Sequence, residues 1–306
     1  MPPRHGDDHV DDLVTLRDWL RFAVSRFSAA QLTYGHGTQN ATDESAVIIL
    51  SSLDLPIDSL DPWLDCRLTR AERQKIANLI AARIETRKPA PYLINAAWIQ
   101  GRRFYVDERV IVPRSFIGEL LCTGQLYAAV GDADSIANVL ELCTGSGCLA
   151  ILAAEAFPEA KILATDISTD ALDVARRNVS DYGLDDCIAL MTSDLFAAIP
   201  PAKYHLILAN PPYVTAASVA AFPAEYKAEP QLAHLGGSDG LDLVHRILDA
   251  APRFLAPNGT IVVEIGQARD ALETARPDLP FLWLDTETSE GEVFVLQAKD
   301  FKPETR

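Results

Sequence analysis

From residue 137 onward the chain alternates short apolar runs with longer amphipathic segments, and this alternation restricts the fold more than any other feature. We expect strands at 137–142, 161–165, 187–191, 204–209 and 260–265. Helices are expected between them, at about 147–157, 168–182 and 240–255. Strands that alternate with helices form a mostly parallel sheet whose faces the helices cover. The sequence therefore predicts an α/β fold for this part of the chain.

Two further extended runs follow the last of these units. Residues 281–284 and 292–296 are apolar, and the short connection between them leaves no room for a long helix. Strands joined by a short connection pair in antiparallel fashion, whereas parallel strands need a long crossover. We therefore expect these two runs to form a terminal antiparallel pair, which makes the sheet a mixed one.

The N-terminal third has a different pattern, with apolar residues at helical spacing. Helices are expected at 13–27, at about 42–53, and from Thr69 until just before Pro89. Thr69 and Glu72 stand at the spacing of a capping box, which favours a helix start. This part shows no pattern typical of a metal site or a nucleophile. We therefore expect it to act as a scaffold or in partner recognition rather than in chemistry.

Between these two patterns lies a stretch that fits neither. Residues 97–112 combine apolar residues with Gly101 and a charged turn, which predicts extended segments joined by turns. The predicted organisation is a helical domain over 1–93, a β-hairpin linker over 94–113, and the α/β domain over 114–306.

The balance of charge excludes some partners. The 306 residues include 43 acidic and 27 basic side chains, which gives a net charge of -16. Such a surface repels phosphate backbones, and nucleic-acid binders usually present a basic face. We therefore expect no direct binding of duplex DNA. The charge would steer a basic protein partner, although it can also serve solubility alone.

Composition also bears on the compartment. No apolar run approaches the ~20 residues that a membrane helix needs. Met1–Asp12 lacks the basic and apolar regions of a secretory signal. Cysteine occurs five times, an odd number without metal-site spacing, since only Cys143 and Cys148 stand close together. We expect a cytoplasmic protein with free thiols, no metal and no membrane contact.

A glycine-containing turn follows the first predicted strand of the α/β part. The turn reads Cys143-Thr144-Gly145-Ser146-Gly147, and a helix is expected to start directly after it. Glycines let the backbone approach a ligand closely, and the N–H groups at a helix start attract polar or anionic atoms. The spacing also fits the dinucleotide fingerprint. The turn therefore indicates a nucleotide-like cofactor without identifying it.

Acidic residues end the next two strands. Asp166 stands where an acidic residue recognises a ribose hydroxyl in nucleotide-binding folds. It can also cap the following helix, although Thr169 and Asp170 are available for that purpose. Asp194 ends the third strand, where the edge of an adenine can lie, or it is an ordinary turn residue. At this point NAD and S-adenosylmethionine both fit the pattern.

The tetrapeptide Asn210-Pro211-Pro212-Tyr213 ends the strand at 204–209 and favours methyl transfer over hydride transfer. The Asn210 oxygen and a proline carbonyl can each accept one N–H of a planar amide. Proline restricts φ and removes a competing donor, so these acceptors stay in place. Tyr213 can pack on the amide plane. We therefore expect methyl transfer from S-adenosylmethionine to a planar nitrogen.

These residues resemble the protein N5-glutamine methyltransferases, a class I methyltransferase family. The similarity runs through almost the whole chain and is strongest to the branch that modifies a glutamine in the third protein of the bacterial large ribosomal subunit. The segments that carry it are Ser25–Ala30, Tyr34–Thr38, Phe104–Val110, Val112–Ser115, Asn210–Tyr213 and Glu229–Pro230. Tyr34–Thr38 favours this branch, because Asn-Pro-Pro-Tyr is shared with the branch that acts on peptide chain release factors.

The resemblance implies a seven-stranded catalytic domain, a helical N-terminal domain that helps to choose a basic ribosomal protein as substrate, and S-adenosylmethionine as donor. The donor residues it implies are Cys143, Thr144, Gly145, Ser146 and Gly147 for the methionine part, Asp166 and Ile167 at the ribose, and Asp194 and Leu195 at the adenine. It further implies that Asn210–Tyr213 hold the substrate glutamine, with Asn210 also near the donor, and that Pro113 and Arg114 line the entrance. Cys143 stands where the wider methyltransferase loop commonly has Gly, and Phe116 where Pro is frequent.

Alternatives remain at this stage. The substrate glutamine can belong to a release factor, the motif also serves adenine N6-methylation in DNA enzymes, and a chain that binds the donor can act only as a scaffold in ribosome assembly. The role of His36 is open. Glu225, Tyr226 and Glu229 contact a basic substrate protein or are simply solvated. Cys148 stands at a helix start, which lowers a thiol pKa, but we expect it to serve packing.

Overall fold

The computed structural model describes residues 10–131 and 133–301, so that most of the polar stretch Met1–Asp12 lies outside the described part. The chain divides into two compact units. One contains the residues up to Ala97 together with Phe222–Glu229, and the other contains Trp98–Ala221 and the chain from Pro230 onward. We call them the helical unit and the sheet unit.

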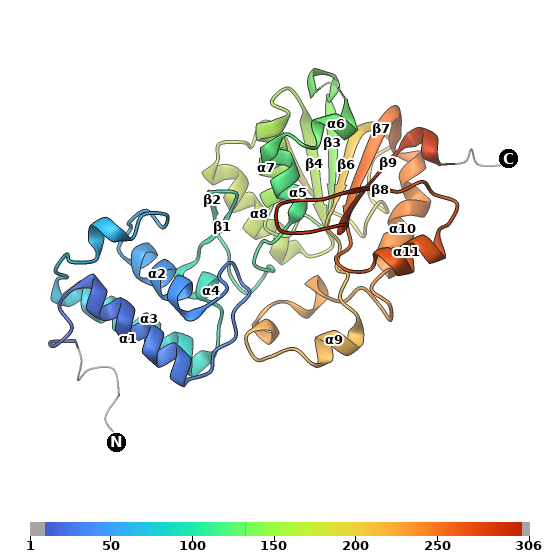
Figure 1. Ribbon diagram of the computed structural model, residues 1–306. Helices are drawn as coiled ribbons and strands as arrows, with labels where there is room; N and C mark the ends of the chain where they lie inside the picture. The colour runs from blue at the N-terminus through green and yellow to red at the C-terminus, as the bar shows by residue number, and fades with distance from the viewer. Residues whose placement is uncertain (1–9, 132, 302–306) are drawn as a thin grey trace. The chain divides into compact units, whose positions relative to one another are not determined.

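The helical unit is built on the amphipathic pattern of the N-terminal third (Figure 1). Its elements are α1 (Leu16–Ala29), α2 (Ala41–Ser52), a 3-10 turn (Asp61–Trp63), α3 (Arg70–Thr86) and α4 (Ala90–Ile94). Trp19, Phe27 and Ile48 are among the side chains that form its core. The side chains of Thr69 and Glu72 close a reciprocal capping box at the start of α3, as the sequence predicted.

A buried ionic cluster joins the segment Phe222–Glu229 to the helices of the helical unit. Glu225 is completely buried, accepts the backbone N–H of Thr33 at 3.0 Å, and lies 3.1 Å from Arg87 and 3.7 Å from Arg83. Arg83 in turn donates to Glu44 at 2.7 Å. Buried charges need partners of opposite sign, because removal from water is unfavourable for an isolated ion. The cluster therefore fixes residues 222–229 within the helical unit.

The structure corrects the sequence interpretation of this segment. Glu225 and Glu229 are buried, so neither is solvated nor offered to a substrate protein. His36 is buried as well, with its Nε2 atom 3.5 Å from Glu229 and its ring 4.3 Å from that of Tyr226. The structure thus places His36 in the interior of the helical unit. Sequence alone could not reveal this, because the contacting residues are almost 200 positions apart.

The sheet unit contains a mixed seven-stranded sheet, which confirms the predicted α/β fold. Its strand order is β5-β4-β3-β6-β7-β9-β8. The strands are β3 (Asn138–Leu142), β4 (Lys161–Asp166), β5 (Ile188–Thr192), β6 (Tyr204–Ala209), β7 (Leu255–Glu264), β8 (Leu282–Leu284) and β9 (Val293–Gln297). β3 to β7 pair in parallel, and β9 pairs antiparallel with both β7 and β8. The expected terminal antiparallel pair is therefore present.

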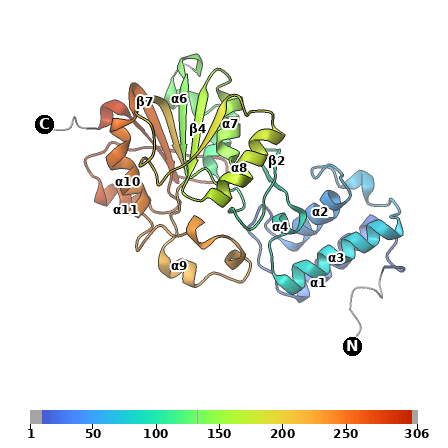
Figure 2. The same ribbon diagram turned by 180° about the vertical axis from the view of Figure 1, so that it is seen from behind.

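Helices cover both faces of this sheet (Figure 1, Figure 2). On one face, α5 (Phe116–Thr123), α6 (Tyr127–Val130) and α7 (Cys148–Ala156) pack with Val139 and Leu206 of the strands. On the other, α10 (Asp242–Ala250) and α11 (Arg269–Ala275) pack with Leu140 and Ile207. Successive strand residues face opposite layers, so strands buried on both faces are apolar throughout.

The remaining elements are short or lie at the edges. They are β1 (Ala97–Ile99) paired with β2 (Arg102–Phe104), α8 (Thr169–Asp181), α9 (Ala216–Ala220), and 3-10 turns at Ala133–Ser135, Tyr226–Ala228, Gln231–Ala233, Ala251–Arg253 and Ala298–Asp300. Within the predicted hairpin stretch, only β1 and β2 are strands, and residues 105–115 are neither helix nor strand. None of the helices in the described ranges combines the length and the apolar composition needed to cross a bilayer.

Two boundaries differ from the prediction for physical reasons. The helix expected at 240–255 ends at Ala250, because Pro252 cannot donate a helical hydrogen bond and a 3-10 turn follows. The helix after β4 is capped by Ser168, whose hydroxyl accepts the N–H of Ala171. The expectation that Thr169 or Asp170 caps it was wrong.

Candidate active site

The predicted site residues gather at the carboxyl ends of β3, β4, β5 and β6. The crossover reverses direction between the neighbouring strands β3 and β6, and ligands bind at such a switch point in open α/β sheets. A cavity of about 320 Å³ opens there, within the ~300–1,000 Å³ of small-molecule sites. The predicted residues that line it are Cys143, Gly145, Asp166, Ile167, Asp194, Leu195, Asn210 and Pro212.

Other predicted residues lie next to the cavity without lining it. Thr144, Ser146 and Pro211 are buried in the turns that carry the lining residues. Gly147 has a φ of +81° and packs closely on Ala175 of α8, where an added Cβ would come within 3.2 Å. The glycine is therefore required by conformation and by the close approach of α8. Pro113, expected at the entrance, is buried and does not line the cavity.

The turn after β3 is held in shape by neighbouring polar groups. The backbone N–H of Gly145 donates to Asp166 at 2.9 Å. The amide of Asn178, on α8, donates to the carbonyl of Ser146 at 2.8 Å. Cys143 has a φ of +59°, a left-handed conformation that explains why glycine suits this position. Its side chain forms part of the cavity wall.

A buried carboxylate supports this turn from below. Glu141, near the end of β3, accepts the hydroxyl hydrogen bond of Thr144 at 2.5 Å. Burial raises the pKa of Glu141 to about 8, and the nearby Asp166 adds to the increase, while the Thr144 bond opposes it. Burial likewise raises the pKa of the Cys148 thiol to about 12. Desolvation thus outweighs the effect of the helix start, and Cys148 is a packing residue.

Asp166 combines the two interpretations that the sequence left open. One carboxylate oxygen accepts the N–H of Gly145, and the other accepts the N–H of Ser168 at 2.9 Å. Burial raises the pKa of Asp166, while bonds from the backbone N–H groups of Ser168, Gly145 and Ile167 lower it. Each carboxylate oxygen has a second lone pair, so the group can still accept a ligand hydroxyl at the cavity wall. Ile167 beside it is 51% exposed, an apolar surface suited to a ring.

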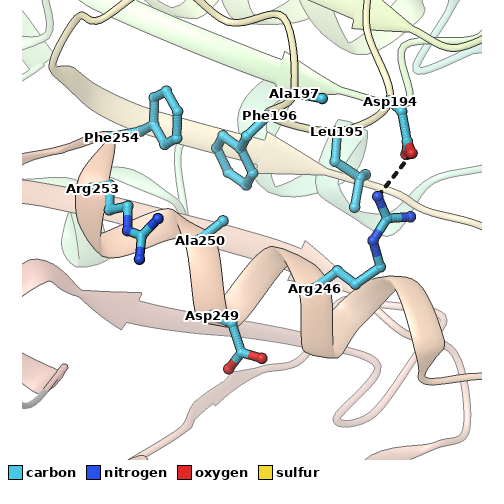
Figure 3. Close-up of a pocket in the computed structure, with 9 residues that line it drawn as sticks. All are labelled: Asp194, Leu195, Phe196, Ala197, Arg246, Asp249, Ala250, Arg253 and Phe254. Carbon is cyan, nitrogen blue, oxygen red and sulfur yellow. Dashed lines mark hydrogen bonds and ion pairs between the residues drawn. The ribbon is translucent and has the colours of Figure 1, made fainter. Parts of the chain in front are cut away.

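Asp194 has a partner that the sequence analysis did not identify. Arg246 on α10 donates to its carboxylate at 2.9 Å, and both residues lie in the wall of the cavity. They also line a neighbouring cavity of about 550 Å³ (Figure 3). That second cavity is larger, with the stacked rings of Phe196 and Phe254 in its wall, but it contains neither the glycine turn nor Asn210. We therefore place the chemistry in the first cavity.

Asn210 is oriented by a distant part of the chain. Its side-chain Nδ2 donates to the backbone carbonyl of Arg114 at 3.2 Å. An amide side chain whose NH2 end is engaged in this way presents its Oδ1 atom as the acceptor for a ligand. Pro212 lines the cavity two residues later, and the proline rings restrict the backbone between them.

Tyr213 is held on two sides by one segment, Glu264–Gly266. Its hydroxyl donates to the Oε1 atom of Glu264 at 3.2 Å. The ring lies so close to Gly266 that an added Cβ would be 2.8 Å from its Cε2 atom. Burial and the Glu264 carboxylate raise the pKa of Tyr213, so the phenol stays protonated.

Several lining residues were not assigned by sequence reasoning. Leu232 and Leu235 follow Glu229-Pro230 and form an exposed apolar rim, while Arg246 is an exposed residue of α10. Nothing in their local pattern distinguishes them, because only the tertiary fold brings them to the cavity. Among residues 10–131 and 133–301, no group of three or more His, Cys, Asp or Glu side chains is arranged to hold a metal ion.

The chain is similar to known methyltransferases in sequence and in fold. Residues 123–225 match the family model described as methyltransferase small domain. The catalytic domain of hMettl16, solved in complex with MAT2A 3'UTR hairpin 6, superposes with a TM-score of 0.50 at 14% identity, over 72% of this chain and 81% of that chain. At this identity the likeness concerns the fold alone. The fold and the site together define a class I methyltransferase.

Two relatives specify the family. The ribosomal protein uL3 glutamine methyltransferase of Bordetella pertussis is 52% identical over 95% of this chain and 97% of its own length. The protein of the same name from Bradyrhizobium diazoefficiens is 50% identical over 94% of this chain and 92% of its own length. The chain belongs to the family of ribosomal protein uL3 glutamine methyltransferases.

S-adenosylmethionine is the methyl donor of this class of enzyme, and the cavity fits it chemically. The wall offers a carboxylate with free acceptor capacity at Asp166, an apolar surface at Ile167 and Leu195, and a glycine turn at Gly145 whose backbone a ligand can approach. These features match a ribose, a flat base and the polar end of an amino acid. The residues present therefore fit the donor.

Proposed function

We propose that this chain methylates the N5 nitrogen of a glutamine side chain in ribosomal protein uL3, in the cytoplasm. The names of the relatives support uL3 as the substrate class. The net charge of -16 suits a basic ribosomal protein and disfavours duplex DNA. The absence of a membrane-crossing helix among the described residues is consistent with this location.

The single observation that carries the proposal is the orientation of Asn210. An amide nitrogen is a weak nucleophile because its lone pair is shared with the carbonyl. With Nδ2 of Asn210 bound to Arg114, its Oδ1 atom can accept one N–H of the substrate amide. A carbonyl of Pro211 or Pro212 would accept the other N–H. Acceptors fixed in advance stabilise the nitrogen as it loses planarity, without reorganisation during the reaction.

Different residues of the chain would bind the methyl donor and the substrate glutamine. Residues 141–147, Asp166–Ile167 and Ser193–Leu195 form a donor half, which would hold and orient S-adenosylmethionine. Residues 113–116, Asn210–Tyr213 and Glu264–Gly266 form a substrate half, which would hold the glutamine amide and exclude water. When bound, the donor supplies a methyl carbon activated by a positively charged sulfur.

The reaction needs no strong base. The acceptors at Asn210 and at a proline carbonyl would hold the amide nitrogen while it receives the methyl group, and one N–H proton would be released after the transfer. Positioning of this kind can contribute several kcal/mol to the lowering of a barrier. Tyr213 would pack against the amide plane, held there by the contacts of its hydroxyl and ring.

The test is a methyl-transfer assay with competing substrates. The purified chain is incubated with radiolabelled S-adenosylmethionine and with purified uL3, a release factor or duplex DNA, and the products are mapped by mass spectrometry. We expect one methyl group on one glutamine of uL3. Labelling of the release factor alone would reject the assignment of substrate, and labelling of adenine would reject protein methylation. A protein that binds the donor but labels nothing would favour the scaffold alternative.

A further inference from the structure

Glu264 is a buried carboxylate that the proposed reaction does not use directly. It ends β7 at the edge of the sheet where the cavity lies, and only 1% of its surface is exposed. A charge in such a position is unfavourable unless hydrogen bonds compensate for the loss of water. The arrangement of those bonds therefore shows what the residue does.

Three hydrogen bonds hold this carboxylate in place. Its Oε2 atom accepts the hydroxyl of Ser115 at 2.7 Å and the backbone N–H of Phe116 at 2.9 Å. Its Oε1 atom accepts the hydroxyl of Tyr213 at 3.2 Å. An ionised carboxylate accepts all three, whereas a protonated one gives up an acceptor site to its own hydrogen. These hydrogen bonds thus favour the charged form, which burial opposes, and they use both of its oxygens.

These bonds close a ring around the substrate half. Ser115 is the N-cap of α5, and its hydroxyl also accepts the N–H of Ile117. The preceding residue, Arg114, accepts the hydrogen bond of Asn210. Residues 114–116 are therefore bound to the first residue of the Asn210–Tyr213 segment directly, and to its last residue through Glu264. Both ends of the segment are fixed to one short piece of chain.

A second contact from the same segment supports this arrangement. Gly266, two residues after Glu264, has a φ of +55° and lies against the ring of Tyr213. The bond to Glu264 holds the hydroxyl end of that ring, and Gly266 lies beside its Cε2 edge. Two independent contacts thus fix the plane of one aromatic side chain, which is more than burial of an aromatic residue requires.

We infer that Glu264 is a positioning residue for methyl transfer, which acts through Tyr213 and Ser115 to hold the Asn210–Tyr213 segment in the conformation that receives the planar amide. The inference rests on the proposed function, because it assigns a role within the same site. A positioning role and a purely structural role predict different effects of removing Glu264. The loss of Glu264 lowers the rate of transfer from bound substrate, while donor binding on the other half persists.

The test is a double-mutant cycle between Glu264→Gln and Tyr213→Phe. Both changes preserve size, and the second removes only the hydroxyl. We expect each single variant to lower kcat about tenfold, the typical effect of one lost hydrogen bond on a barrier. The double variant falls no more than about twofold further, because both changes break the same contact. KM for uL3 and the donor Kd, measured by calorimetry, change less than about threefold in each variant.

Two matched controls accompany the cycle. Glu155→Gln makes the same chemical change at an exposed residue of α7 that pairs with Arg102, and it leaves kcat unchanged. Glu141→Gln makes it at the buried carboxylate below the donor turn, where donor Kd rather than kcat should respond. The inference is overturned if Glu264→Gln leaves kcat within about twofold of the parent, or if the two single effects multiply in the double variant.

An NMR measurement tests the contact between Glu264 and Tyr213 without relying on methyl transfer. In the donor-bound protein with 13C-labelled tyrosine, the ring signal of Tyr213 is identified by its absence from Tyr213→Phe. We expect Glu264→Gln to shift that signal and leave other tyrosine signals in place, and an unchanged signal refutes the inference. This readout holds even if uL3 is not methylated, an outcome that rejects the proposed function alone. If Glu264→Gln does not fold, Ser115→Ala replaces it in both experiments, with the same expected direction.

Discussion

The donor half and the substrate half of the proposed site are assembled in different ways. In the donor half, neighbouring strand ends provide the contacts, as when Gly145 donates to Asp166 only 21 positions away. In the substrate half, side chains join distant segments. Asn210 and Arg114 are 96 positions apart, Ser115 and Glu264 are 149 apart, and Tyr213 and Glu264 are 51 apart.

This difference indicates which residues determine donor affinity and which determine the rate of transfer. Any parallel sheet with this strand order brings the donor residues together, because the backbone pairing fixes their positions. The substrate half depends on a few side-chain hydrogen bonds, so a single substitution can displace it. We therefore expect donor affinity and transfer rate to respond to separate sets of mutations.

The largest effect is expected at Asn210. Asn210→Ala removes the acceptor for the substrate amide and should lower kcat by about 10² or more, as the loss of one preorganised polar group does in other enzymes. Donor Kd should stay within about threefold, because the donor half keeps its contacts. Radiolabelled transfer and calorimetry measure the two quantities. Asn138→Ala, at the exposed opposite end of β3, is the matched control, and turnover equal to the parent in Asn210→Ala would refute the division into halves.

The converse substitution lies in the donor half. Asp166→Ala removes the carboxylate expected at the ribose and the acceptor that fixes Gly145. We expect donor Kd to rise about 30-fold, consistent with the loss of hydrogen bonds to a charged group. At saturating donor, kcat should fall much less. Isothermal titration calorimetry measures the donor Kd. A large fall in kcat with intact donor affinity would contradict the separate roles of the two halves.

A smaller effect is expected from steric pressure on Tyr213. Gly266→Ala places a Cβ against the ring and strains a position with a φ of +55°. We expect a fall in kcat of about tenfold, because a displaced positioning group misaligns the reacting atoms. Donor affinity should not change. Gly131→Ala, at another positive φ with open space around it, controls for backbone strain, and equal losses in the two variants would attribute the effect to stability.

The smallest effect concerns pH. Burial raises the pKa of Glu264 to about 7, against the hydrogen bonds from Ser115, Tyr213 and Phe116. Since the ionised form holds Tyr213, kcat should rise several-fold as pH increases through about 7. The charges of Arg114 and Glu292 also act on the pKa of Tyr213, and the charge of Glu264 acts on the pKa of the Cys148 thiol. Glu264→Gln should remove the rise, and a rise that survives in this variant would assign it to another group.

Stability should respond to the same group with the opposite sign. The folded-state pKa of Glu264 lies above its unfolded value, so between about pH 4.3 and 7 the folded protein binds a proton that the unfolded chain has lost. The free energy of unfolding should therefore fall as pH rises through that window, by a few kcal/mol at most. Denaturant titrations at several pH values measure this fall, which Glu264→Gln should reduce.

Much of the fold could be predicted from the sequence, because its signals are local. Apolar runs give β3 to β6 within one residue, and Thr69 with Glu72 marks the start of α3. β7 begins at Leu255, five residues before the predicted strand. The sequence analysis offered Thr169 and Asp170 as caps where the structure has Ser168, because several residues that can cap stand side by side there. The early end of α10 is explained by Pro252, whose effect on the boundary was underestimated.

The part of the candidate site that follows directly after predicted strands could be predicted from the sequence. Cys143, Asp166, Asp194 and Asn210 each follow a predicted strand, and the topology of a parallel sheet brings such residues to one edge. The ion pair of Asp194 with Arg246 was not predictable, because it joins residues 52 positions apart. The role of Glu264 had no local signal either, since its partners lie far away in the chain.

The two-piece construction of the helical unit limits how this enzyme can be taken apart. Deletion of the residues up to Ala97 would remove Arg83 and Arg87 but leave Glu225 in the remaining polypeptide. That carboxylate would lose its cationic partners, and the loop that follows the Asn210 motif would lose its anchor. Exchanging the helical unit between relatives therefore requires transplanting Phe222–Glu229 together with the first ninety-seven residues, since both pieces contribute residues to its buried ionic cluster.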